Sequence, residues 1–140
     1  MWRVARRKYF IGAGVGELRS MLAPFDEEIE ARAYRRHVMG RTLDVLADSG
    51  VAIISINNQH FNHWVLAIGV SGFKAGSDSL PSKLLILDPG HNPVPLAPWN
   101  ATLSVKGGSL DRRAYEMPTG KVFVDLGSVL TIKRSTKKKR

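Results

Sequence analysis

Two stretches of sequence decide the predicted fold: QHFNHWVLAIGV at residues 59–70 and KLLILDP at residues 83–89. Each contains a run of four or more apolar, partly β-branched residues between polar, Gly or Pro residues, which is the pattern of a β-strand. Residues 71–82 between them carry Ser, Gly, Asp and Pro, as loops do. We therefore expect two strands that pair as an antiparallel hairpin.

The pairing that we expect places His63 opposite Asp88 and Leu66 opposite Leu85. In this register both polar side chains stand on one face of the sheet, because strand side chains alternate. Residues directly opposite have Cβ atoms roughly 4.5–5.5 Å apart, close enough for a carboxylate to accept from an imidazole N–H. A slip of one residue would move the two side chains to opposite faces. The pair predicts the base half of a nucleophilic site, with His63 and Asp88 as catalytic residues.

The composition is that of one folded domain, which we place at residues 1–132. Of the 140 residues 44% are hydrophobic and 24% are charged, as in ordinary globular proteins. No apolar run approaches the roughly 18 residues of a membrane helix, and no signal peptide is evident, so we expect a cytoplasmic protein without membrane insertion. The sequence contains no cysteine, which excludes disulfides, thiolate metal sites and a thiol nucleophile within this chain.

Positive charge is concentrated at the C-terminus. Six of the Lys and Arg residues fall in the segment 133–140, while the whole chain has a net charge of +9. We expect this segment to be a disordered basic tail. Such clusters bind phosphate groups nonspecifically, so an alternative function is a non-enzymatic interaction module that binds nucleic acid or an acidic partner.

The order of the predicted elements is helices first and strands afterwards, which favours an α+β fold with a mostly antiparallel sheet. Residues 107–119 are polar and predict a loop, and Gly127 predicts a bend or bulge within the last strand. The predicted helices are 12–22, 26–39 and 42–49, and the predicted strands, besides the central hairpin, are 51–56, 94–99, 101–105 and 121–132.

The passage LADSGVAIISI, followed by HFNHWVLAIGV and then KLLILDPG, resembles the second half of papain-like cysteine peptidases of the C39 or C39-like group. The likeness covers residues 41–90, about a third of the chain. It implies that His63 matches the catalytic histidine and Asp88 the acid that orients it. It also implies a papain-like half-domain, incomplete at its N-terminus, in which N-terminal helices pack on the sheet.

The nucleophile of that family is missing from this sequence. Its cysteine and the preceding oxyanion-hole glutamine have no counterpart, because the chain has no cysteine and its one glutamine, Gln59, stands elsewhere. The resemblance then implies a degenerate peptidase that binds a peptide or protein substrate, or one part of a split or truncated peptidase whose cysteine-bearing helix belongs to a second chain. We expect no peptidase activity from this chain alone.

Three residues that flank the pair, Asn62, Trp64 and His91, are predicted to bind substrate, although Trp64 also suits a core position. His60, His63, Asp88 and His91 together suggest a metal site at first sight. His60 and His63 are three apart on an extended segment, however, so their side chains should point to opposite faces. We therefore expect neither a metal nor a cofactor.

Overall fold

The computed structural model describes residues 14–73, 80–108 and 111–136. Strands make up 45% and helices 18% of these residues. All strand pairings within the described ranges are antiparallel. The strands are β1 (Ile29–Tyr34), β2 (Val51–Asn57), β3 (Asn62–Ser71), β4 (Lys83–Leu87), β5 (Ala101–Ser104), β6 (Arg113–Met117) and β7 (Gly120–Arg134).

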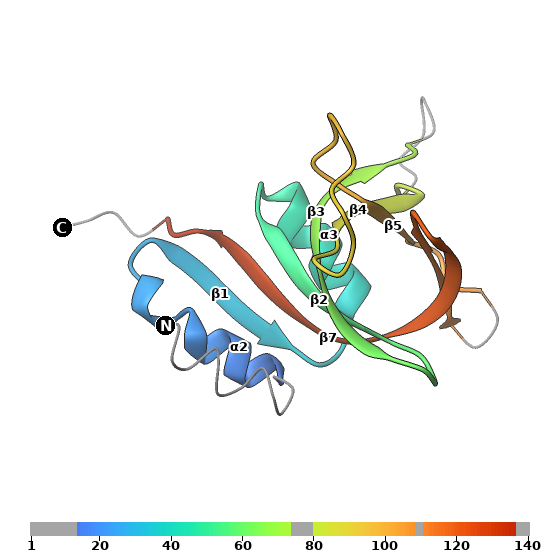
Figure 1. The fold of residues 1–140 in the computed structure, drawn as a ribbon. Coiled ribbons are helices and arrows are strands. Elements are labelled where there is room, and N and C mark those ends of the chain that lie inside the picture. Colours follow the sequence, from blue (N-terminus) through green and yellow to red (C-terminus); the bar gives the residue numbers. More distant parts are fainter. Residues whose placement is uncertain (1–13, 74–79, 109–110, 137–140) are drawn as a thin grey trace.

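Six of these strands close into a barrel. The order in the sheet is β1-β7-β2-β3-β4-β5-β6, and β6 also pairs with β7. The first part of the 15-residue β7 pairs with β6, and its later part pairs with β2 and β1. Figure 1 shows β7 running from the barrel to β1, which extends the sheet beyond the barrel. The predicted α+β, papain-like half-domain is therefore wrong, because the chain is mostly β and its sheet closes on itself.

The predicted bend at Gly127 is a β-bulge. Between the pairs Ile54–Val129 and Ile56–Leu126, β7 contains one residue more than β2. A Cβ at Gly127 would lie 2.8 Å from the side-chain nitrogen of Asn57 on β2, so a larger residue at the bulge would have to displace this side chain. An extra residue increases local twist and bends the strand. The bulge thus lets β7 pair with β6 and β2 of the barrel and also with β1, which lies beyond the barrel.

Two apolar clusters occupy opposite faces of the sheet. The main core fills the barrel, where Val45 of helix α3 (Val38–Ala47) packs with Ile54 and Val65. On the outer face, helix α2 (Val15–Met21) covers a smaller group that we call the outer cluster. The outer cluster comprises Val15, Leu18, Leu22, Ile29, Ala31, Ile53, Trp64, Leu130 and Ile132.

No helix among the described residues is long and apolar enough to cross a membrane.

Several predicted elements are confirmed. Helix α2 lies within the first predicted helix, and α3 largely coincides with the third, although it begins four residues earlier. Strands β2, β3, β4, β5 and β7 occupy the segments predicted for them. The predicted tail begins too early, because β7 continues to Arg134 and Lys133 lies 2.6 Å from the Asp48 carboxylate. Residues 137–140 lie outside the described residues.

Three other predictions are wrong. Residues 26–39 form no single helix but hold β1 and the start of α3, and a 3₁₀ helix, η1 (Ala23–Phe25), precedes them. The β1 sequence IEARAY alternates along its length, and pairing with β7 decides its conformation. The predicted loop 107–119 contains β6, whereas the predicted strand 94–99 is irregular.

The central hairpin forms in a different register from the one predicted. Leu66 faces Leu87 rather than Leu85, and Ile68 is an extra residue of β3 between two neighbouring pairs. The shift at Leu66 is two residues, and an even shift keeps each side chain on its original face. His63 and Asp88 therefore still share the inner side of the sheet.

Candidate functional site

His63 and Asp88 meet at one end of the barrel. His63 is the second residue of β3, and its side chain shares the inner face with the core residues Val65 and Ala67. Asp88 directly follows β4. The His63 Nε2 atom lies 2.7 Å from Asp88 Oδ1, so the hydrogen bond expected between imidazole and carboxylate is present.

The Asp88 carboxylate is almost completely buried, with 1% of its side chain exposed. Oδ1 also accepts a hydrogen bond from the Gly90 N–H at 2.8 Å, and Oδ2 accepts one from the Tyr115 hydroxyl. Burial raises the pKa of Asp88, but the bonds from Tyr115, His63 and Gly90 outweigh burial and bring this pKa below its usual value. Asp88 is therefore a buried anion held by three donors.

Tyr115 reaches Asp88 from β6, which is separated from β4 by β5 in the sheet. Only 1% of Tyr115 is exposed. Burial and the hydrogen bond to the negative Asp88 both raise the pKa of the Tyr115 hydroxyl well above its usual value. Tyr115 therefore remains a neutral donor at physiological pH and fixes the second carboxylate oxygen.

Asn100 holds the turn that carries Asp88. Its side-chain oxygen accepts the Asp88 N–H at 2.7 Å, and its nitrogen donates to the Asp88 carbonyl at 2.9 Å. The same nitrogen lies 3.2 Å from the His91 carbonyl oxygen and 3.4 Å from that of Asn92. Asn100 is 5% exposed. We call His63, Asp88, Tyr115 and Asn100 the barrel-end network.

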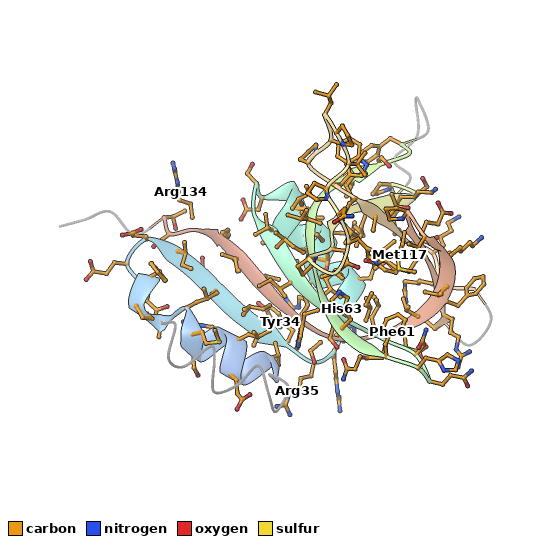
Figure 2. The ribbon with its side chains drawn as sticks, in the orientation of Figure 1. Tyr34, Arg35, Phe61, His63, Met117 and Arg134 are labelled. Atoms are coloured by element: carbon orange, nitrogen blue, oxygen red, sulfur yellow. The ribbon has the colours of Figure 1, made fainter. Side chains whose placement is uncertain are left out.

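A cavity of about 220 Å³ opens beside this network. His63, Asp88 and Tyr115 line it together with Phe61, Asn62, His91 and Met117. Figure 2 shows Phe61, His63 and Met117 in the same part of the molecule. The side chain of His63 is 35% exposed, in contrast to its buried partner.

The geometry distinguishes the two ring nitrogens of His63. Asp88 accepts from Nε2, and no described residue forms a hydrogen bond with Nδ1. A carboxylate at one nitrogen keeps the ring proton there and leaves a lone pair on the other. The arrangement can therefore take a proton at Nδ1, while Asp88 stabilises the imidazolium that forms.

The residues predicted to bind substrate separate into two groups. Asn62 and His91 line the cavity, and His91 Nε2 lies 3.8 Å from Asp88 Oδ2. Trp64 follows His63 on β3 and so faces the other way, into the outer cluster. The structure thus places Trp64 away from the cavity.

The described part of the chain holds no group of three or more His, Cys, Asp or Glu side chains arranged to hold a metal ion. The Asp88 carboxylate, which lines the cavity, already accepts three hydrogen bonds.

The sequence prediction missed Tyr115 and Asn100. Tyr115 lies in a segment predicted as a loop, yet Pro118-Thr119-Gly120 is a turn signal that would have indicated a hairpin of β6 and β7. Asn100 directly precedes a predicted strand, and no local pattern shows that its amide would satisfy a turn twelve residues earlier. Asn100 reaches Asp88 through the pairing of β4 with β5, and Tyr115 reaches it through the further pairing of β5 with β6.

Comparisons with protein-family models, with curated proteins and with solved structures gave no significant match. The resemblance to C39-like peptidases therefore stays a prediction, and the function has to be inferred from the geometry of the barrel end.

Proposed function

We propose that this chain is a β-barrel domain that supplies the histidine base of an acyl-transfer site to a peptide or similar carbonyl compound. One observation carries the proposal: His63 is open to a cavity, while its Nε2 is held at 2.7 Å by the buried Asp88 carboxylate. A carboxylate with only a structural role would not need an exposed imidazole as one of its three donors.

His63 would accept the proton of the attacking group at Nδ1. Asp88 would hold the proton on Nε2 and balance the positive charge of the imidazolium. Tyr115 and the Gly90 N–H would keep Asp88 in place during this change. These contacts would give His63 the role of a general base. The atom that attacks the carbonyl carbon would come from a group outside the barrel-end network.

The nucleophile in the intact system would lie outside the present sequence, which has no cysteine. We therefore propose a peptide-binding part of a split or truncated peptidase, inactive on peptides when alone. The predicted cytoplasmic location stays a prediction. The alternative of nucleic-acid binding by the basic tail rests largely on residues 137–140, which lie outside the described ranges.

An activated ester tests the base without the second chain. With p-nitrophenyl acetate, His63 Nδ1 would take a proton from water, the water oxygen would bond to the carbonyl carbon, and p-nitrophenolate would leave. His63→Gln keeps an N–H donor for Asp88 but removes the base. We expect the rate constant for ester hydrolysis to fall by about tenfold or more in this variant.

His60→Ala is the matched control, because His60 is an exposed histidine that contacts Gln59 rather than the network. Its ester hydrolysis should equal that of the wild type. Equal rates for wild type and His63→Gln would overturn the proposed base.

A further inference from the structure

A second cavity, of about 290 Å³, lies beside the His63 cavity. Apolar lining comes from Val94 and Trp99 in the segment after β4, and from Met117 and Pro118 at and just after the end of β6. The polar residues Asn100, Thr102 and Glu116 line the same cavity. This volume is below the roughly 300–1,000 Å³ that is typical of sites for whole drug-sized ligands. It suits one large side chain or a short acyl chain.

Met117 connects the two cavities, since it lines both of them. Met117 lies just beyond the ladder of β5 and β6, which comprises Thr102–Glu116 and Leu103–Tyr115. A ligand in the His63 cavity would pass Met117 to reach the second cavity.

The apolar segment that walls the second cavity is fixed in place. The Asn100 side chain donates to the carbonyl groups of Asp88 and His91, at the start of this segment. Val94 remains 39% and Trp99 37% exposed, although both are large and apolar. These two side chains give the wall of the second cavity exposed apolar surface that a ligand could cover.

We propose that the second cavity binds a large apolar side chain or acyl chain of the same ligand whose carbonyl group lies beside His63. The occupant follows from three features: the apolar part of the lining, a size that fits one such chain, and the position of Met117 in the lining of both cavities. This inference rests on the proposed function. It defines the substrate class as peptides or esters with a bulky apolar group next to the reacting carbonyl.

Ligand binding tests this subsite separately from catalysis. N-acetyl-leucinamide and N-acetyl-alaninamide would be titrated into the full chain, with the Trp99 indole and Met117 methyl signals followed by NMR. We expect both signals to shift with the leucine compound, and the alanine compound to bind about tenfold or more weakly. The Trp99→Ala variant, followed at the Met117 methyl, should lose this preference.

Phe123→Ala is the control, because Phe123 is 55% exposed and lines neither cavity. It should retain the preference for leucine. Equal affinity for both compounds in the wild type, or an unchanged preference in Trp99→Ala, would overturn the subsite. A leucine preference without any effect of His63→Gln on ester hydrolysis would leave the subsite standing and remove only the base.

Discussion

The neighbouring residues His63 and Trp64 lie in two regions that are built in opposite ways. Trp64 points into the outer cluster, which consists of apolar side chains between α2 and the sheet. His63 points to the barrel-end network, where a buried carboxylate is surrounded by donors. Both regions depend on contacts between segments distant in sequence.

The difference between the two regions shows where a function is to be sought. Apolar burial stabilises the outer cluster without any special geometry. A buried anion needs all its partners, and apolar residues of similar size often stabilise a fold as well or better. The barrel-end network is therefore the region whose chemistry exceeds what folding requires.

The largest expected effect is that of Asp88→Ala. The donors of His63, Gly90 and Tyr115 would lose their acceptor, and each buried donor left unpaired costs about 1–3 kcal/mol. We expect a loss of about 4 kcal/mol in the free energy of unfolding, measured by urea denaturation. Asp125→Ala, which removes a partly exposed ion pair with Arg112, should change it by less than about 0.5 kcal/mol. Similar values for both variants would contradict a network.

Leu130→Ala probes the outer cluster in the same way. Leu130 is fully buried, and a cavity in its place should lower the free energy of unfolding by about 3 kcal/mol. The NMR signals of the His63 ring should stay unchanged at the same time, because Leu130 faces away from the barrel interior. If Leu130→Ala changed the NMR signals of the His63 ring as much as Asp88→Ala does, the outer cluster and the barrel-end network would not be separate regions.

Tyr115→Phe is expected to have a smaller effect at neutral pH, about 1–3 kcal/mol, from one lost hydrogen bond to a buried carboxylate. The raised pKa of Tyr115 adds a pH dependence. Its contribution to stability is fully present below the unfolded pKa of about 10 and is lost as the pH rises beyond that. Urea denaturation from pH 8 to 11 should show a steeper loss for the wild type than for Tyr115→Phe. Parallel curves would contradict the raised pKa.

The sequence predicts the central strands of the sheet well and the closure of the sheet into a barrel poorly. Strands β2, β3 and β4 are strongly apolar runs between clear boundaries, so local pattern is enough to find them. The contact between His63 and Asp88 follows from their place on this hairpin, and it survives the two-residue error in register because the shift is even.

The remaining strands lack such apolar runs. β1 and β6 are short and carry charged residues. β1 pairs with the end of β7, far along the chain, whereas β6 forms a hairpin with the start of β7 across a turn at residues 118–119. Without β6 in place neither barrel closure nor the contact of Tyr115 with Asp88 could be predicted. Trp64 shows the same limit, because its side of the strand was predictable and the cluster it joins was not.

The protonation state of the His63 ring tests the proposed base most directly. Long-range ¹H–¹⁵N spectra of the wild-type chain at pH 8 report which ring nitrogen carries the proton. With Asp88 at Nε2, we predict the proton on Nε2 and a free lone pair on Nδ1. A proton found on Nδ1 would leave the ring's lone pair on Nε2, beside Asp88, and would contradict the account.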